Sequence, residues 1–396
     1  MRATTKTSAE QRLQEEVVST ELFRVLREAH GENFNSIISS KVIPVSGDVA
    51  YENLGVIDSK LREEMWQEID IIVNSAATTK FDERYDVSFG INAMGAMHIQ
   101  DFGTKCSKLE VLLHVSTAYV HGSRVGLAPE TSFRMGETLP GAKIPYLDIN
   151  LEKSIIEERL GLLQTQKLSE KEITRAMKDL GIERTLDSIF VGYGKGKLKF
   201  FVGDPESVTD LMPGDMVVNC MLAAMASSHS SSDKKDLIVY QVGSSRRNPV
   251  KYEEIKWLMH RYLTKNPLLD NKGNPIKVGL PITLNTMASF HNYISFHYSP
   301  FLEVLKLTNM ICCNLFESLY TNAKRRINHA LRLAELYKPY LFSQAIFDDS
   351  NTDNLRMRMR GSNIDMELLN FDPKCIMWDD YLLNTHFLGI AKYVLK

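Results

Sequence analysis

The chain has 396 residues, of which 44% are hydrophobic, and its formal net charge at pH 7 is -2. A chain of this length and apolar content can bury a large core and form two domains, which excludes a disordered protein. A nearly neutral chain has no general attraction for polyanions, so the composition argues against nucleic-acid binding. We therefore expect a folded protein of two domains that does not bind nucleic acid.

The five cysteines show no spacing typical of a metal site or a disulfide framework. Cys312 and Cys313 are adjacent, and neighbouring cysteines do not readily bridge each other. Residues 1–10 lack the apolar stretch of a signal peptide. These features predict a protein without a metal that is not secreted and stays inside the cell, in the cytoplasm or associated with the endoplasmic reticulum.

Short apolar runs separated by helical patterns characterise the first part of the chain. The runs expected to be strands cover residues 41–48, 69–78, 111–120 and 237–242, and the helical patterns cover residues 9–29, 59–68, 87–106, 148–180 and 208–227. This alternation is typical of a doubly wound parallel sheet. Residues 122–145 are rich in Gly and Pro and predict a loop, whereas the pattern beyond Val250 is mainly helical.

The expected sheet lacks two of its usual parts. Such sheets seat the pyrophosphate of a dinucleotide on a glycine-rich turn after the first strand, but the only glycines before Asp48 are Gly31 and Gly47. A further apolar strand should follow the helix that ends near Gly181, but the sequence continues from Arg184 through Thr185 into a glycine-rich stretch at Gly192. We therefore predict the α/β class, with an incomplete Rossmann-type parallel sheet over residues 1–250 and a mainly helical domain over residues 251–396.

Polar and small residues at the expected strand ends are the candidate site residues. Asp48 stands where a carboxylate or its backbone can meet an adenine ring, or where an acid simply faces solvent. Small residues after Asn74 allow a cofactor to approach the backbone, and they also suit tight packing between strand and helix. Ser116 and Thr117 could polarise a substrate carbonyl by hydrogen bonding, or could cap a turn.

Carbonyl reduction also requires a proton donor, which short-chain reductases supply with Tyr-x-x-x-Lys on a helix. The four-residue spacing places both side chains on one helix face, so the ammonium lowers the pKa of the tyrosine. Matches to this spacing are Tyr193 with Lys197, Tyr252 with Lys256, and Tyr320 with Lys324. The first is surrounded by glycines and the others follow the last expected strand, so none is predicted to be catalytic.

Residues 296–316 are the most apolar part of the helical region. Glu303, Lys306 and Asn309 interrupt them, so no apolar run reaches the roughly 18 residues that a membrane-spanning helix needs. An ordinary amphipathic core helix explains the pattern. A helix that lies on a bilayer or lines an acyl groove is the alternative.

The motif His114-Val-Ser-Thr-Ala-Tyr-Val120, read with Asp70-Ile-Ile-Val-Asn74 and Phe81-Asp-Glu-Arg-Tyr-Asp86, resembles the alcohol-forming fatty acyl-CoA reductases, particularly those of plants. Further matching motifs cover residues 91–92, 193–198, 210–219, 337–340, 347–352 and 378–381. They occur in the family's order and extend over nearly the whole chain. The combination is therefore much more specific than any one motif.

The resemblance implies an extended short-chain reductase domain joined to a smaller male-sterility-like helical domain. It also implies NADPH-dependent reduction of long-chain acyl-CoA, through an enzyme-held aldehyde, to primary alcohols for wax, suberin or pollen wall. By residue match, the cofactor side would be lined by Asp48, Asn74, Ala76, Ala77 and Asn92. Thr117, with Ser116 beside it, would orient the thioester and then the aldehyde carbonyl.

The chain departs from the family pattern at the glycine-rich loop and at the helical Tyr-x-x-x-Lys, neither of which has a counterpart. One interpretation is a reductase by descent. A second is a non-catalytic relative that binds acyl chains or a partner, with peripheral membrane association or pairing with full-length reductases. A third is an incomplete gene model or exon-skipped transcript.

Overall fold

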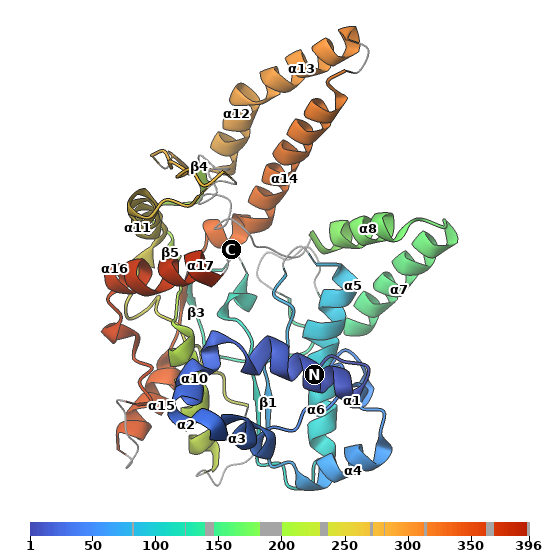
Figure 1. The fold of residues 1–396 in the computed structure, drawn as a ribbon, viewed down its shortest axis with the longest axis vertical. Helices are drawn as coiled ribbons and strands as arrows, with labels where there is room; N and C mark the ends of the chain where they lie inside the picture. The colour runs from blue at the N-terminus through green and yellow to red at the C-terminus, as the bar shows by residue number, and fades with distance from the viewer. Residues whose placement is uncertain are drawn as a thin grey trace. The chain divides into compact units, whose positions relative to one another are not determined.

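The computed structural model describes residues 1–80, 83–122, 124–138, 146–182, 200–229, 237–269, 272–280, 282–312, 315–361 and 368–393 (Figure 1). Its contacts divide the chain into two compact units. Unit 1 comprises residues 1–79, 83–116 and 169–178, and unit 2 comprises residues 80–82, 117–168 and 179–396. The boundary predicted at residue 250 stays a prediction, because a compact unit of contacts need not coincide with a domain of the sequence.

Unit 1 opens with short helices, as the spacing over residues 9–29 predicts. They are α1 (Lys6–Arg12), the π turn η1 (Leu13–Val18), the 3-10 turn η2 (Glu21–Phe23), α2 (Arg24–His30), the 3-10 turn η3 (Gly31–Asn33) and α3 (Phe34–Lys41). Thr5 caps the first helix by accepting a hydrogen bond from the Ser8 N–H. Thr20 has an extended backbone, which interrupts the predicted helix, and Gly31 ends α2 with a φ of 50°.

The two central predicted strands form a parallel pair, as expected, but both are shorter than the predicted residues 69–78 and 111–120. β1 (Ile71–Asn74) and β2 (Val111–His114) align Ile71 with Val111 and Asn74 with His114. The helical elements around them are η4 (Glu52–Gly55), α4 (Ser59–Glu68), α5 (Tyr85–Ser88), η5 (Phe89–Met94) and α6 (Gly95–Lys105). A Cβ on Gly103 would lie 3.0 Å from Leu112 Cδ1, so this glycine brings α6 close to the strands.

The prediction of a strand over residues 41–48 is wrong. Residues 42–46 have no strand structure, and Ile43 is 78% exposed. The Met1 ammonium donates to Val45 O over 2.7 Å, and Arg2 forms a single bridge with Gly47. An apolar run forms a strand only where a neighbour pairs with it along its length, and among the described residues only this short contact is present.

The prediction of a strand over residues 237–242 is also wrong. Side chains, in place of a neighbouring strand, satisfy its backbone. Asn351 Nδ2 donates to Val239 O over 3.0 Å, Thr352 Oγ1 donates to Gln241 O over 3.2 Å, and the Gln241 N–H donates to Glu130 over 2.6 Å. The segment is therefore an extended loop held by polar side chains.

Unit 2 contains three further strand pairs in its described residues. β3 (Val125–Ala128) is parallel to β8 (Gln344–Phe347), β4 (Phe200–Val202) is parallel to β7 (Ile282–Leu284), and β5 (Val208–Thr209) is antiparallel to β6 (Val250–Lys251). β3 corrects the prediction that residues 122–145 form only a loop. The α/β class is confirmed, because helices alternate with strands that pair mostly in parallel. Each described sheet has two strands.

Helices make up most of unit 2, as predicted beyond Val250. They include the 3-10 turn η6 (Ala118–His121), α7 (Ile149–Thr165), α10 (Gly214–His229), α11 (Tyr252–Lys265), α15 (Ser350–Arg360), the 3-10 turn η7 (Pro373–Cys375), α16 (Trp378–Asp380), the π turn η8 (Tyr381–His386) and α17 (Phe387–Tyr393). α8 (Glu170–Ile182) begins in unit 1 and ends in unit 2. α7 and α8 replace the single helix predicted over residues 148–180.

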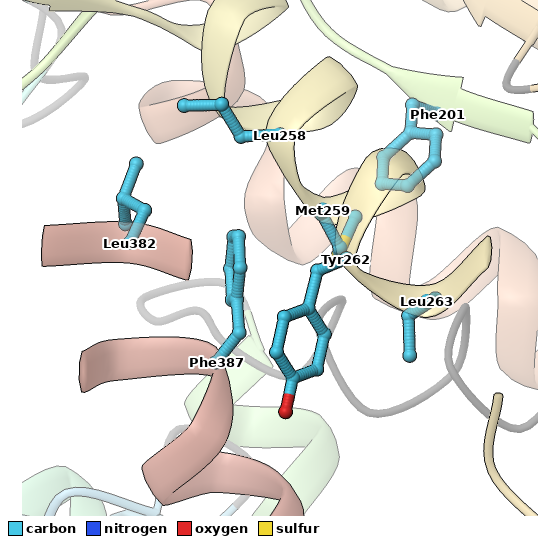
Figure 2. Close-up of a cluster of buried hydrophobic side chains, with 7 residues drawn as sticks. All are labelled: Phe201, Leu258, Met259, Tyr262, Leu263, Leu382 and Phe387. Atoms are coloured by element: carbon cyan, nitrogen blue, oxygen red, sulfur yellow. The ribbon is translucent and has the colours of Figure 1, made fainter. Parts of the chain in front are cut away.

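A buried apolar cluster joins α11 to the end of the chain. Figure 2 shows the side chains that form it, which are Phe201, Leu258, Met259, Tyr262, Leu263, Leu382 and Phe387. The four residues from α11 are spaced so that they share one helix face. Tyr262 and Phe387 pack with their ring centroids 5.6 Å apart. The C-terminal helices are therefore part of the core of unit 2.

α12 (Met287–His297) and α13 (Ser299–Ile311) lie against α14 (Glu317–Leu341), which runs back alongside them (Figure 1). Phe290 and Ile294 of α12 are buried with Ala334 and Leu341 of α14. Thr286 and Ser289 form a capping box that begins α12. Among the described residues, none of the helices combines the length and apolar content that crossing a membrane requires.

Candidate functional site

Asn74 and His114 meet at the carboxyl ends of β1 and β2. Asn74 is buried, and its Oδ1 accepts a hydrogen bond from the Ala76 N–H over 3.1 Å. This contact directs its Nδ2 to His114 Nδ1, which lies 2.9 Å away. Because an amide nitrogen can only donate, His114 Nδ1 must accept, and the neutral ring carries its proton on Nε2. Desolvation lowers the pKa of His114, which agrees with a neutral ring.

We expect the His114→Gln variant to lose less stability than the native protein when the pH falls from about 7.5 to about 5. The pKa of His114 is lower in the folded state than the unfolded value of about 6.5. Its contribution is therefore present above about pH 6.5 and lost as the pH falls through the folded pKa. Gln retains an acceptor for Asn74. Urea unfolding across this pH range measures the effect, with the exposed His30→Gln as the control. An equal loss of stability in all three proteins would contradict the assignment.

Asp48 stabilises a tight turn that packs on α6. Its Oδ1 accepts from the Ala50 N–H over 3.0 Å, and its own N–H donates to Leu54 O over 2.8 Å. His98 Nδ1 donates to Val49 O over 3.0 Å and ties the turn to α6. The Asp48 carboxylate thus stabilises the turn by accepting one of its backbone N–H groups. A role toward the adenine ring stays a prediction.

Asn92 fixes the loop that follows β1. Its Oδ1 accepts from the Thr78 N–H over 2.9 Å, and its Nδ2 donates to Thr78 O over 3.1 Å. Ala76 and Ala77 lie exposed in the same loop. The structure therefore brings together Asn74, both alanines and Asn92, as the sequence suggests, whereas their role in cofactor binding stays a prediction.

Ser116 and Thr117 follow β2 and are both exposed. Ser116 ends its segment of unit 1, and Thr117 is the first residue of the next segment of unit 2. Thr117 Oγ1 accepts from the Tyr119 N–H over 3.3 Å at the start of η6. The oxygen of Thr117 therefore caps a turn, which is one of the two roles that the sequence suggests. Among the contacts of the described residues, none uses the hydroxyl hydrogen, which can therefore donate to a substrate oxygen.

Tyr119 anchors the turn that begins at Thr117. Its Oη accepts from the Asp210 N–H over 3.2 Å and donates to Asp210 O over 3.4 Å. Its ring centroid lies 5.1 Å from that of Tyr340 and 5.2 Å from that of Phe347. Reasoning from the sequence missed this role. The available signal was that all four residues occur within the motifs that carry the family resemblance.

The Asp210 carboxylate extends this anchor. It accepts from the Ser244 N–H over 2.9 Å and from Ser245 Oγ over 2.5 Å, and Ser245 Oγ accepts from the Phe347 N–H over 3.0 Å. A Cβ on Gly243 would lie 2.6 Å from Asp210 Oδ2, so this approach requires glycine. Burial raises the pKa of Asp210, although these hydrogen bonds oppose the shift.

Glu130 holds the start of α15 in a similar way. Although almost fully buried, its carboxylate accepts from the Thr352 Oγ1 over 2.8 Å and from the backbone N–H groups of Gln241, Asn351 and Thr352. Burial raises the pKa of Glu130, and the hydrogen bonds oppose this shift. Glu130 thus connects the loop at Gln241 to the start of α15, and the sequence gave no indication of this role.

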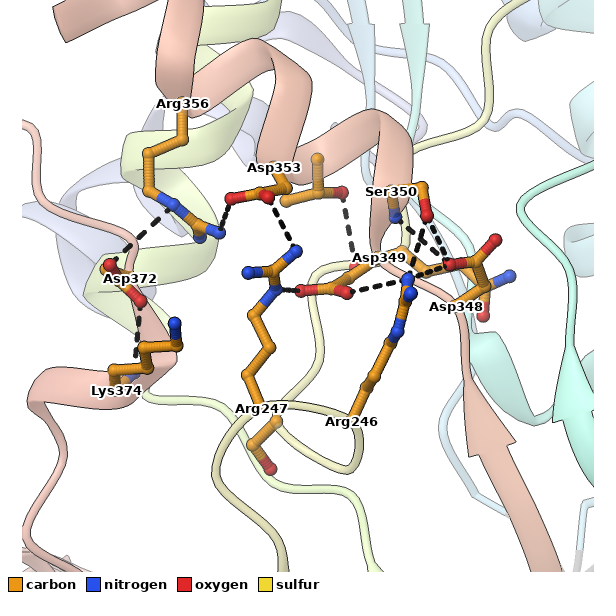
Figure 3. A network of polar contacts seen from close by, with 12 residues as sticks. Arg246, Arg247, Asp348, Asp349, Ser350, Asp353, Arg356, Asp372 and Lys374 are labelled. Carbon is orange, nitrogen blue, oxygen red and sulfur yellow. Dashed lines mark hydrogen bonds and ion pairs between the residues drawn. The ribbon is translucent and has the colours of Figure 1, made fainter.

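Charged pairs surround the same end of α15 (Figure 3). Arg246 pairs with Asp348, and Arg247 pairs with both Asp349 and Asp353. Arg356 is almost fully buried, and it binds Asp353 over 2.5 Å and the Phe371 carbonyl over 3.3 Å. The motif at residues 347–352 therefore serves as scaffold, and it connects to Tyr119 through Phe347.

Comparison with known proteins finds relatives that match along the whole of this chain. Residues 1–183 and 296–396 match two family models, each described as male sterility protein, and the first model is named for NAD binding. The alcohol-forming fatty acyl-CoA reductase of Simmondsia chinensis is 39% identical over 100% of this chain and 91% of the relative. Fatty acyl-CoA reductase 1 of Arabidopsis thaliana is 41% identical with the same coverage. The chain belongs to the fatty acyl-CoA reductase family.

The fold also has a distant likeness among solved structures. The terminal R domain from the myxalamid PKS-NRPS biosynthetic pathway aligns with a TM-score of 0.48 and 14% sequence identity, over 94% of this chain and 81% of that one.

This family member is shorter than its relatives within the matched region. The alignment with the Simmondsia reductase spans 450 positions and the chain has 396 residues, so at least 54 aligned positions have no residue here. The predicted loss between Arg184 and Thr185 falls at residues outside the described part of the chain. Its position therefore stays a prediction.

Two of the three pairs with the Tyr-x-x-x-Lys spacing lie in the described residues. Tyr193 and Lys197 lie outside them. Tyr252 Oη donates to Val202 O over 3.2 Å, burial raises its pKa, and Lys256 binds Glu253 over 2.5 Å. Lys324 Nζ lies 5.6 Å from the ring centroid of Tyr320 on α14. The buried Tyr252 hydroxyl is therefore engaged with a backbone carbonyl.

The residues that would hold an NAD-type cofactor fit it only in part. The loop after β1 is small and exposed, which suits close approach by a nucleotide. Residues 1–80 contain Gly31, Gly47 and Gly55, and none follows a strand, because β1 is the first. A glycine-rich cradle for the pyrophosphate is therefore absent from these described residues.

Proposed function

We propose that this chain is an alcohol-forming fatty acyl-CoA reductase that takes long-chain acyl-CoA and NADPH and yields a primary alcohol. The observation that carries the proposal is similarity along the whole chain, at 39% identity to a relative named alcohol-forming fatty acyl-CoA reductase and at 41% to one named fatty acyl-CoA reductase. The exposed Ser116 and Thr117 at the end of β2 support it, because carbonyl substrates of such sheets lie at the carboxyl edge.

In this proposal the two hydroxyls act on the carbonyl oxygen. Donation from Thr117, with Ser116 beside it, polarises the thioester and stabilises the negative charge that develops on its oxygen. After hydride addition to the thioester carbon, the tetrahedral oxyanion collapses, the C–S bond breaks and coenzyme A leaves as the thiolate. The same donors bind the aldehyde oxygen for the second reduction, and the alkoxide that results takes its proton from water. NADPH supplies the hydride in each reduction when it is bound.

A second candidate function is a non-catalytic relative that binds acyl-CoA or a full-length reductase. The observation that favours it is the largely buried Tyr252, whose hydroxyl donates to Val202 O and is therefore not directed to a substrate. For both candidates we propose an intracellular location in the cytoplasm or at the endoplasmic reticulum, with peripheral attachment to membranes.

Purified chain should bind NADPH saturably, oxidise it in the presence of long-chain acyl-CoA and release the alcohol, which mass spectrometry detects. Absence of both NADPH binding and alcohol would overturn the reductase proposal. If acyl-CoA nevertheless raises the melting temperature, the result supports the binding function, because a ligand that binds the folded state stabilises it. A matched short-chain acyl-CoA serves as the control.

A further inference from the structure

His114 is held in one tautomer by its neighbour on β1. Asn74 is only 4% exposed, and its Oδ1 accepts from the Ala76 N–H, so the amide cannot turn over without losing this bond. Its Nδ2 therefore donates to His114 Nδ1 over 2.9 Å, and the imidazole proton stays on Nε2. A proton on Nδ1 would place two donors against each other at a buried contact. The ring is thus fixed as a neutral donor in the absence of a ligand.

The other ring nitrogen of His114 is left to donate. The side chain is exposed, and among the contacts of the described residues none involves Nε2. An unconstrained histidine on a surface exchanges between two tautomers and a charged form. Here one nitrogen is committed to Asn74, so the second nitrogen presents a hydrogen in every folded molecule. This is the arrangement that a preorganised donor to a bound oxygen requires.

His114 lies at the edge of the strand pair where the candidate site residues gather. It is aligned with Asn74 at the carboxyl ends of β1 and β2, and the Val115 N–H extends the pairing by donating to Asn74 O over 2.8 Å. Residues 115–117 make no turn or bend, so the chain stays extended to Ser116. Side chains two residues apart in an extended chain share one face, roughly 7 Å apart. His114 and the exposed Ser116, which both belong to unit 1, therefore lie on the same side of this edge.

We propose that His114 is a further catalytic residue, whose Nε2–H donates a hydrogen bond to the reacting oxygen of the acyl substrate beside Ser116. This assignment rests on the proposed reductase function and adds a donor to it. A neutral imidazole donates its hydrogen bond and keeps its proton, so it stabilises the negative charge on the oxygen in both reductions. Asn74 is then a positioning residue, because it acts on the substrate through His114.

Replacing His114 with Gln and with Glu separates a donor to the substrate from a residue that only joins the strands. Both side chains offer Asn74 an acceptor oxygen, so both keep the contact between β1 and β2. Only Gln has an amide hydrogen left to donate, so it should retain the native kcat within about threefold. Glu presents a second acceptor to the oxyanion and should lower kcat at least about 10²-fold, with a smaller change in the KM for acyl-CoA.

Two further variants control for charge and for stability. His114→Leu removes the donor without adding a charge, and it should lower kcat at least about tenfold. His30→Glu adds the same charge at another exposed histidine and should leave kcat unchanged. Urea unfolding measures the stability of each variant separately. Equal kcat in the Gln and Glu variants of His114 would overturn the proposal and leave His114 with a structural role between the strands.

A binding measurement separates this proposal from the reductase proposal. In the full chain with isotope-labelled histidine, nitrogen NMR should place the proton of His114 on Nε2. Palmitoyl-CoA added with NADP⁺, which cannot supply a hydride, should shift the Nε2 resonance of His114 and leave that of His30 unchanged. A shift in a chain that forms no alcohol would contradict the reductase proposal and retain His114 as a donor to the acyl substrate. Absence of the shift would overturn the assignment to His114, whether or not the alcohol forms.

Discussion

Replacing Thr117 with valine is expected to lower kcat/KM for acyl-CoA reduction by about 10²–10³-fold, because it removes a hydrogen-bond donor to the developing oxyanion. Valine keeps the shape of threonine and loses the hydroxyl. NADPH oxidation and alcohol formation, measured over a range of acyl-CoA concentrations, give kcat and KM separately. A donor that acts mainly on the developing charge should lower kcat with little change in KM.

Thr117→Ser is the informative control for this experiment. Serine retains both the acceptor for the Tyr119 N–H and the donor for the substrate, so it should recover most of the activity. The valine variant also loses the turn contact, and urea unfolding measures that cost separately. If both variants retained native kcat/KM, or if the loss followed stability alone, Thr117 would be a turn cap and not a catalytic residue.

Helices and strands could be predicted from the sequence where neighbouring residues alone determine them. Asp58 caps α4 by accepting from the Lys60 N–H over 3.0 Å, and the helix occupies the predicted residues 59–68. β1 and β2 were predictable because each apolar run lies between helices and finds a parallel partner. The runs at 41–48 and 237–242 look the same in sequence. These two runs do not form strands, because a strand needs a neighbouring strand to pair with and an apolar pattern does not specify that neighbour.

The missed elements depend on contacts that are distant in sequence. β3 has only four residues, one of them Gly126, and it pairs with β8 far along the chain. Reasoning from strand ends placed Asn74, Ser116 and Thr117 correctly at the ends of β1 and β2. It could not find the support of Tyr119 by Asp210, which is 91 residues away. The position of a polar residue at a strand end is a local property, whereas the partner that holds it is not.

Glu130 makes a contact that is especially distant in sequence, because it accepts a hydrogen bond from Thr352, 222 residues away. We expect Glu130→Ala to lower the free energy of unfolding by about 3–5 kcal/mol, since it leaves several buried donors without an acceptor at about 1–3 kcal/mol each, partly relieved by water. The donors are the N–H groups of Gln241, Asn351 and Thr352. Urea unfolding followed by circular dichroism measures the change.

Glu137→Ala is the matched control, because Glu137 is exposed on the same loop and accepts only the Arg134 N–H, over 2.8 Å, among the contacts described. Its cost should stay within about 0.5 kcal/mol. A small, equal effect in both variants would mean that water replaces the Glu130 carboxylate and that the start of α15 holds without it. A large effect confined to Glu130→Ala, accompanied by loss of activity, would instead connect the scaffold to catalysis. Contacts connect Glu130 to Thr117 in two steps. In the sequence, Asp348 and Asp349, which form ion pairs, lie between Phe347 and Thr352. Phe347 packs on Tyr119, two residues after Thr117.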